Sequence, residues 1–264
     1  MRFETIILLI SFIISIILGI IIIPILKKLK VGQIERDDGP QSHLKKQGTP
    51  TMGGIIMIIA MIIMVTGAYV YLTCNQQPEL ANKLLPILLL TIGFGLIGFI
   101  DDFKKLVLKN TKGLKPSYKM LGLLIISVAY VIYLVYGLNI GTDTYIPFIK
   151  QSINIPVYLY IPFAIIVILA TTNAINLTDG IDGLSSSIST IIITCLTIVG
   201  IALKVEEIGI FGSIVIGAVL GFLMFNLHPA KVFMGDTGSL LLGGVISSMA
   251  LYVKMPLLLI IIAF

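Results

Sequence analysis

Residues 98–105 of this chain read GFIDDFKK, and the segments on either side of them decide the fold. The apolar run Leu84–Ile100 ends at two adjacent carboxylates, Asp101 and Asp102, and six lysines follow by Lys119. If the run is a membrane helix, the acidic pair lies at its C-terminal end and opposes the helix macrodipole at a cost of about 0.3–1 kcal/mol each. Sequences accept such local conflicts mainly at functional sites. Two solvated charges where a helix leaves the bilayer are the alternative interpretation.

The composition indicates an integral membrane protein. Of the 264 residues, 57% are hydrophobic and only 12% are charged, and the mean hydropathy is +1.08. Soluble domains carry about a quarter charged residues. The net charge of +5 does not indicate nucleic-acid binding, because the basic residues cluster in loops beside apolar runs. Cys74 and Cys195 fall in different environments, a loop and a span, so we expect free thiols.

The apolar runs predict an all-α, polytopic membrane helix bundle that forms a single domain over residues 1–264. The predicted spans are Thr5–Leu26, Gly53–Thr73, Leu84–Ile100, Met120–Leu138, Ile155–Ile175, Leu184–Leu203, Ile208–Leu227 and Ser239–Val253. The first has no signal-peptide cleavage site, so we expect a retained helix. A ninth run starts at Pro256 and is cut off at Phe264. We therefore expect a fragment that is incomplete at its C-terminus.

The basic residues predict the orientation in the membrane. Threading the spans places loops 27–52, 101–119, 176–183 and 228–238 on one side of the bilayer. That side collects thirteen of the lysines and arginines, and the other side has five. The positive-inside rule assigns the richer side to the cytoplasm, so the N-terminus lies outside.

Polar motifs are confined to this predicted cytoplasmic face. Four of them lie far apart in the sequence, at residues 36–54, 101–105, 173–183 and 226–239. The first motif is much longer than the roughly 2–8 residues that link neighbouring helices. Because all four lie on one face, we expect them to converge at a single site.

Each motif also has a structural interpretation when it is taken alone. The first can be a solvated connector, and the lysines near the acidic pair can be a basic flank attracted to anionic lipid. Asp236 lies between two glycines at the start of a span, where it can cap the helix or where the helix amides can favour an anion. We expect His228 to be a structural or interfacial histidine.

The spacing within the motifs suits phosphoryl chemistry. Asn176, Asp179 and Asp182 recur every three residues and share one face if they lie on a helical turn. Lys105 and Lys109 lie one turn apart if the helix continues, which suits a polyphosphate. Carboxylates hold Mg²⁺ through one or two contacts while substrate phosphates supply the rest. There is no GxxxxGK[ST] loop. A transporter is disfavoured, because it would place ionisable groups at mid-membrane.

The motifs also resemble those of a known family. Residues 38–54, 176–184 and 233–239 match the polyprenyl-phosphate N-acetylhexosamine-1-phosphate transferases nearly residue for residue, and the resemblance covers essentially the whole chain. The first stretch favours the branch that transfers phospho-N-acetylmuramoyl-pentapeptide. Transfer of N-acetylglucosamine 1-phosphate to the same lipid is the alternative.

The resemblance implies a reaction and a fold. UDP-N-acetylmuramoyl-pentapeptide and undecaprenyl phosphate would give lipid I and UMP, with Mg²⁺ as cofactor, in the first membrane step of peptidoglycan synthesis. The family fold is a bundle of ten helices in the bacterial cytoplasmic membrane, often as a homodimer.

The resemblance further implies roles for individual residues. The implied metal ligand is Asp236, with Asn176 beside it, and the implied catalytic groups are Asp101, Asp102 and Asp236. The implied substrate-binding residues are Lys46, Thr51, Lys105, Lys109, Lys119, Asn176, Asp179, Asp182, Asn226 and Phe233, the last expected to stack on uracil. The family continues into a cytoplasmic loop with a run of histidines and a last helix, which this chain lacks. An inactive truncated form is therefore a further alternative.

Overall fold

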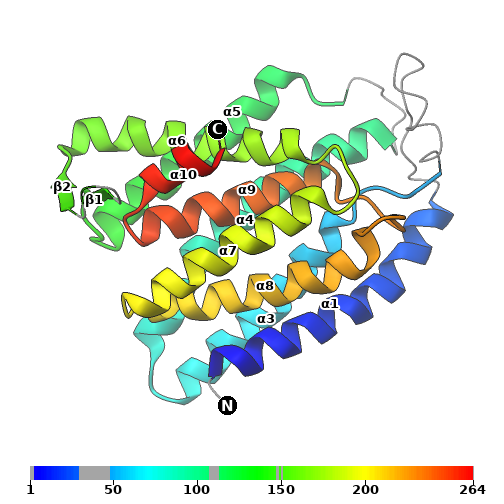
Figure 1. Ribbon diagram of the computed structural model, residues 1–264, viewed down its shortest axis with the longest axis horizontal. Coiled ribbons are helices and arrows are strands. Elements are labelled where there is room, and N and C mark those ends of the chain that lie inside the picture. Colours follow the sequence, from blue (N-terminus) through cyan, green and yellow to red (C-terminus); the bar gives the residue numbers. More distant parts are fainter. Residues whose placement is uncertain (1–2, 30–47, 107–112, 147–148, 150, 264) are drawn as a thin grey trace.

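The computed structural model describes residues 3–29, 48–106, 113–146, 149 and 151–263. Its helices run alongside one another as a bundle (Figure 1). They are α1 (Phe3–Lys28), α3 (Gly54–Cys74), α4 (Pro78–Leu106), α5 (Pro116–Ile132) with the π-helical turn η1 (Tyr133–Gly137), α6 (Val157–Thr178), α7 (Leu184–Ala202), α8 (Glu206–Asn226), α9 (Gly235–Tyr252) and α10 (Pro256–Ala263). Among the described residues, seven helices are long and apolar enough to cross a membrane. The predicted all-α polytopic bundle is confirmed, and the number of spans stays a prediction.

Helix α9 forms the centre of the bundle. Every residue from Thr237 to Tyr252 is buried, because α9 packs against α3, α4, α6 and α7 (Figure 1). The helix is rich in glycine and serine, and small residues let helix backbones approach closely. At Gly243, for example, a Cβ would lie 2.5 Å from Thr172 Cα of α6. Close packing on all sides therefore fixes where α9 begins.

Helix α1 packs lengthwise against α8 in the same way. The hydroxyl of Ser11 donates to the carbonyl of Ile214 at 2.6 Å, and that of Ser15 donates to the carbonyl of Ala218 at 2.7 Å. These bonds satisfy polar side chains that would otherwise be costly in an apolar environment. The opposite face of α1 exposes a row of large apolar side chains, as expected for a lipid-facing surface.

Two local expectations were wrong. The span predicted as Leu84–Ile100 was too short, because α4 runs from Pro78 to Leu106. Asp101 and Asp102 lie in its C-terminal turns, as expected, and they are buried rather than solvated. The motif around Asn176 does not form one helical face, because α6 ends at Thr178. The chain then turns through Gly183, whose φ of +73° suits glycine. The Asp182 side chain lies beside His228 and Ala230 instead of beside Asn176.

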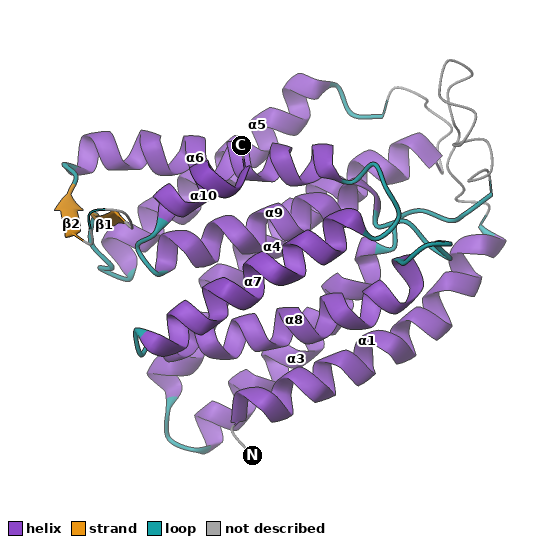
Figure 2. Ribbon diagram, viewed as in Figure 1, coloured by secondary structure: helices purple, strands orange, loops and turns teal. Residues whose placement is uncertain are grey.

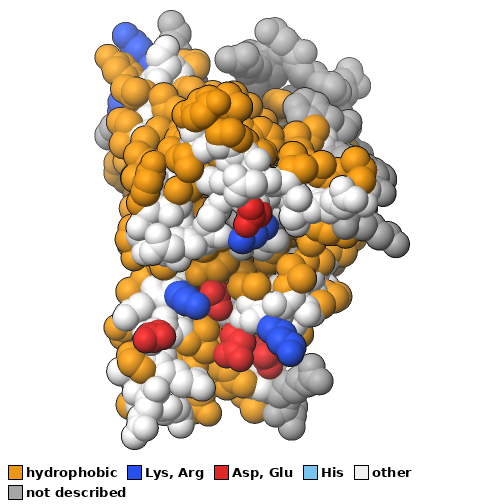
Figure 3. All heavy atoms as spheres, turned by 90° about the vertical axis from the view of Figure 1, so that its left-hand side faces the viewer, with side chains coloured by type: hydrophobic (Ala, Val, Ile, Leu, Met, Phe, Trp, Pro, Cys, Tyr) orange, Lys and Arg blue, Asp and Glu red, His pale blue; other side chains and the backbone are white. Residues whose placement is uncertain are grey.

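A short hairpin connects η1 to α6 and lies beside the start of α10 (Figure 1). Strands β1 (Asp143–Ile146) and β2 (Gln151–Asn154) pair antiparallel, and the sequence did not predict them. The Tyr145 amide donates to the Lys254 carbonyl at 2.8 Å, and the Lys254 ammonium lies 3.3 Å from Asp143 Oδ2. Hydrogen bonds from Asn154 and Lys254 lower the pKa of Asp143 from its usual value. Figure 3 shows the end of the bundle where this hairpin lies, with charged side chains scattered among apolar and polar atoms.

Candidate active site

The predicted motifs come together at the opposite end of the bundle. There the last turns of α4 and α6 meet the first turns of α5 and α9 (Figure 1), and the connecting loops gather beside them (Figure 2). Asp101 of α4, Lys119 of α5, Asn176 of α6 and Asp236 of α9 lie within direct contact of one another or of shared partners. Residues more than a hundred positions apart in the chain thus form one polar cluster inside an apolar bundle.

Asp236 is the centre of this cluster. Its Oδ2 atom accepts from Lys105 Nζ at 2.8 Å and from Lys119 Nζ at 3.0 Å. Its Oδ1 atom accepts from the Asn176 amide at 2.7 Å, and the same amide nitrogen donates to Ser239 Oγ at 2.7 Å. Helices α4, α5 and α6 therefore each supply a donor to one carboxylate at the start of α9.

Asp101 shares a lysine with Asp236. Its Oδ2 lies 2.5 Å from Lys105 Nζ and 3.8 Å from Lys119 Nζ, while its Oδ1 accepts from the Leu114 backbone N–H at 2.6 Å. Only 2% of Asp101 is exposed. Two carboxylates and two ammonium groups thus balance in charge, which keeps the burial of charge tolerable.

Asp102 points away from the lysines and toward the backbone of α9. Its Oδ1 accepts from the Asp236 N–H at 3.2 Å, and its Oδ2 accepts from the Thr237 N–H at 2.8 Å and from the Thr237 hydroxyl at 2.6 Å. Asp102 is 4% exposed. The neighbouring aspartates in the sequence therefore have different surroundings: Asp101 contacts lysines, and Asp102 contacts the start of a helix.

Glycines permit this close approach. A Cβ at Gly98 of α4 would overlap the Asp236 carbonyl and lie 2.7 Å from the Thr237 nitrogen. Gly235 has a φ of +70°, and a Cβ there would lie 2.5 Å from Asp102 Oδ2 and 2.9 Å from Thr51 Oγ1. Both positions require glycine, one for space and the other for space and backbone conformation.

The segment before α3 is held against the segment before α9. The Phe233 N–H donates to the Pro50 carbonyl and the Gly53 N–H donates to the Phe233 carbonyl, both at 2.8 Å. This pairing brings Thr51 beside Gly235 and Asp102. Thr51 and Phe233, which the resemblance assigned to substrate, thus lie next to the polar cluster.

Other predicted residues lie at the edge of the site. Asp182 Oδ2 lies 3.1 Å from His228 Nδ1 and accepts from the Ala230 N–H at 3.2 Å. Asn226 is buried, accepts from the Ser186 hydroxyl at 2.7 Å and donates to the Val232 carbonyl at 3.0 Å. Both side chains thus hydrogen-bond to residues of the loop 228–234, which precedes Asp236.

The remaining predicted residues are placed as follows. Asp179 is the C-cap residue of α6, one turn beyond Asn176. Lys46 and Lys109 lie outside the described residues.

Three contributors to the site had no role in the sequence analysis. They are the hydroxyls of Thr237 and Ser239 and the backbone N–H of Leu114. The signal for the hydroxyls was available, because both residues lie in the motif that contains Asp236. The Leu114 amide carried no signal, since any residue type except proline could donate it.

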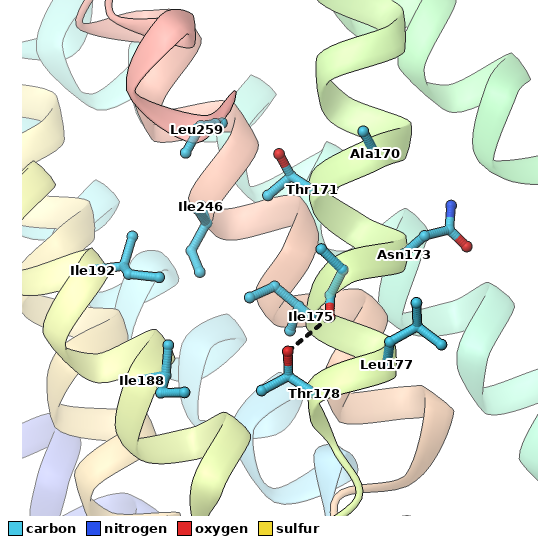
Figure 4. A pocket seen from close by; sticks show the side chains of 11 residues that line it. Ala170, Thr171, Asn173, Ile175, Leu177, Thr178, Ile188, Ile192, Ile246 and Leu259 are labelled. Atoms are coloured by element: carbon cyan, nitrogen blue, oxygen red, sulfur yellow. Dashed lines mark hydrogen bonds between the residues drawn. The ribbon is translucent and has the colours of Figure 1, made fainter. Parts of the chain in front are cut away.

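Two cavities border the part of α6 that leads to Asn176. One, of about 330 Å³, is lined by the polar side chains of Asp101, Lys105, Lys119 and Asn173 together with Leu114, Pro116, Met120 and Leu123. The other, of about 620 Å³, lies between α6, α7, α9 and α10 (Figure 4). It is mainly apolar, and its lining includes Ala170, Ile175, Ile188, Ile192, Ile246 and Leu259. Asn173 lines both cavities. Its side chain lies on the side of α6 that faces away from Ile188 and Ile192 (Figure 4), so this turn of α6 separates the charged cavity from these apolar side chains.

Asp236 and Asn176 are the residues that could hold Mg²⁺ together with bound phosphates. Within the described ranges, no three His, Cys, Asp or Glu side chains form a metal cluster. Mg²⁺ needs only one or two carboxylates when phosphate oxygens and water complete its shell. Asp236 offers a carboxylate with the Asn176 side-chain amide beside it, and two ammonium groups already lie where positive charge is favoured.

Comparisons with known proteins agree with this geometry. The sequence profile described as Glycosyl transferase family 4 matches residues 84–254. Three similar proteins carry the name phospho-N-acetylmuramoyl-pentapeptide-transferase. The one from Clostridium botulinum (strain Alaska E43 / Type E3) is 47% identical over 97% of this chain and 75% of its own length. Those from Acetivibrio thermocellus and Bacillus subtilis (strain 168) are 44% and 42% identical, over 96% of this chain and 74% and 76% of their own lengths. The matched span includes Asp101, Asp102, Asn176 and Asp236, and we conclude that the chain belongs to glycosyl transferase family 4.

Proposed function

We propose that this chain transfers phospho-N-acetylmuramoyl-pentapeptide from its UDP-linked donor to undecaprenyl phosphate, giving lipid I and UMP. Relatives at 42–47% identity carry the name of that transferase. The single structural observation that supports the reaction is the convergence of Lys105, Lys119 and Asn176 on the Asp236 carboxylate. Such a cluster suits a diphosphate, because it offers positive charge and a metal-binding carboxylate within one small volume.

The lysines and Asp236 account for binding of the donor diphosphate. When Mg²⁺ is bound, it neutralises charge on the phosphates and on the leaving group. Asp236 and Asn176 would hold it. Lys105 and Lys119 then turn from Asp236 toward phosphate oxygens, which they meet as flexible point charges. Thr51 and Phe233, next to the cluster, would contact the nucleotide part of the donor.

The two cavities account for the lipid acceptor. The apolar cavity between α6, α7, α9 and α10 suits a polyprenyl chain (Figure 4). The apolar cavity and the charged cavity share the lining residue Asn173, so a lipid phosphate that passes this turn of α6 would reach both. An acceptor in this position has its hydrocarbon in an apolar environment and its phosphate beside Asp101 and Lys105.

The chemical step follows from this arrangement. An oxygen of the lipid phosphate attacks the phosphorus that bears the sugar, a new pyrophosphate bond forms, and the bond to UMP breaks. Among the described residues that line the charged cavity, Asp101 is the carboxylate, and it can accept a proton from the lipid phosphate. Formation of an aspartyl-phosphate in a first step is the alternative route. In the proposed orientation, the thirteen lysines and arginines on the site's side face the cytoplasm, where a UDP-linked donor is present.

A transfer assay tests the proposal. Membranes that contain the chain are incubated with Mg²⁺, undecaprenyl phosphate and either UDP-N-acetylmuramoyl-pentapeptide or UDP-N-acetylglucosamine, and labelled lipid-linked product is extracted. We expect product from the pentapeptide donor only, and a loss of at least about 10²-fold in Asp236→Asn and in Asp101→Asn. Asp143→Asn, the same change at the far end of the bundle, should retain the rate.

Each contrary result has a distinct meaning. Product from UDP-N-acetylglucosamine alone would establish the alternative donor, and no product from either donor would reject the transferase. Near-normal rates in Asp236→Asn would remove that residue from the mechanism.

A further inference from the structure

The neighbouring residues Asp101 and Asp102 have different roles in the site. This inference rests on the proposed function. Asp102 is buried and accepts hydrogen bonds from the N–H of Asp236 and from the N–H and hydroxyl of Thr237. Asp101 is among the described residues that line the charged cavity, and Asp102 is not among them. The hydrogen bonds that Asp102 accepts come from the first turn of α9, whereas Asp101 contacts the two lysines that line the cavity.

The start of α9 lacks a cap of its own. Its N-cap residue is Met234, whose side chain makes no capping hydrogen bond. The first backbone N–H groups of a helix have no partner within the helix, and leaving them buried and unsatisfied is costly. An ordinary N-cap side chain accepts from the second or third residue of the helix. Those residues in α9 are Asp236 and Thr237, and their N–H groups donate to Asp102.

We propose that Asp102 is a positioning residue that caps α9 from α4, with the Thr237 hydroxyl as its specific partner. The carboxylate takes the place of the missing N-cap side chain and holds the backbone of Asp236. Its negative charge also lies at the positive end of the α9 macrodipole. Asp102 thereby sets the position of the Asp236 carboxylate, and proton transfer at the cavity is left to Asp101.

Two glycines, one on α4 and one on α9, leave the space that this cap needs. Gly98 lies one helical turn before Asp102 on α4 and leaves room for the Asp236 carbonyl. Gly235 leaves room for the Asp102 carboxylate, which a Cβ would meet at 2.5 Å. A side chain at either glycine would push the cap away from the helix that it holds.

A double-mutant cycle tests the cap. Thr237→Val keeps the shape of the side chain and removes its donor, and Thr237→Ser restores the donor. Per folded molecule, we expect kcat to fall about 10-fold in Thr237→Val, to recover in Thr237→Ser, and to fall about 10²-fold in Asp102→Asn, in line with a lost cap and a displaced carboxylate. The double variant should be no slower than Asp102→Asn, since both changes break one interaction. Thr73→Val, on an exposed hydroxyl of α3, is the matched control.

Folded protein is counted by size-exclusion chromatography in detergent, because a purely structural cap would lower only the amount of folded protein. A wild-type kcat per folded molecule in Thr237→Val would overturn the inference. So would an Asp102→Asn variant that is as inactive as Asp101→Asn while Thr237→Val has no effect, because Asp102 would then act in the chemistry.

Thermal unfolding keeps this test separate from the proposed function. If the wild type makes no lipid-linked product, the transferase proposal fails and the cap is judged from Tm alone. Lower Tm values in Thr237→Val and Asp102→Asn that do not add in the double variant support the cap. Additive or absent shifts reject it.

Discussion

Replacement of Gly98 by alanine should disable the site without removing any of its polar groups. The new Cβ would overlap the Asp236 carbonyl and lie 2.7 Å from the Thr237 nitrogen. Both are backbone atoms of α9, so no side chain can rotate away to relieve the overlap. Ordinary contact begins at 3.4 Å, so α4 and the start of α9 must separate by at least 0.7 Å, and by more at the carbonyl.

The expected loss follows from this displacement. A shift of about 1 Å in a reacting group can cost about 10²-fold in rate, and Asp236 moves with the backbone that Gly98 contacts. We therefore expect kcat in the transfer assay to fall about 10²-fold in Gly98→Ala. Helix α4 itself should tolerate the change, because alanine is the better helix former by about 1 kcal/mol.

A second glycine provides the control. A Cβ added at Gly67 of α3 would have no heavy atom within 4 Å, so Gly67→Ala should keep the wild-type rate and a Tm at or above that of the wild type. Both variants are compared per folded molecule, with protein counted by size-exclusion chromatography. A Gly98→Ala variant within twofold of the wild-type kcat would refute the argument that backbone contact with α4 places Asp236.

Three further predictions concern orientation, charge and the hairpin. A membrane-impermeant maleimide added to intact cells should label the exposed Cys74 at the end of α3 that is remote from the site; labelling that appears only after permeabilisation would reverse the proposed orientation. Lys105→Met should lower kcat/KM at least about 10²-fold, because it removes the ammonium shared by the carboxylates of Asp101 and Asp236, and an unchanged value would exclude that lysine from substrate binding. The pKa of Asp143 is lower in the folded protein than in the unfolded chain. Its ion pair with Lys254 is therefore fully formed above the unfolded-state pKa of about 3.9, and it is lost as the pH falls through the folded-state pKa. Protection of the Tyr145 amide from hydrogen exchange should therefore be constant at neutral pH and decline only below about pH 3.9, and a wild-type decline near neutral pH would contradict this.

Much of the fold was open to prediction from the sequence. Long apolar runs predicted the helices within a few residues, because a segment in lipid must satisfy its own backbone hydrogen bonds. The same reasoning missed the hairpin after η1, which is short and carries no apolar pattern. It also ended α4 at Ile100, because charged residues normally mark the edge of the bilayer and the partners that bury Asp101 and Asp102 lie far away in the chain.

The membership of the site was also visible in the sequence, since Asp101, Lys105, Lys119, Asn176 and Asp236 all lie in or beside the predicted motifs. The different contacts of Asp101 and Asp102 were not visible in the sequence. Adjacent aspartates look equivalent in a sequence, and only the crossing of α4 and α9 directs Asp101 toward lysines and Asp102 toward helix amides. Local sequence determines which segments are helical, because hydrophobicity and hydrogen bonding act along the chain. The tertiary structure decides what each carboxylate contacts, because those contacts depend on how closely two distant backbones can approach.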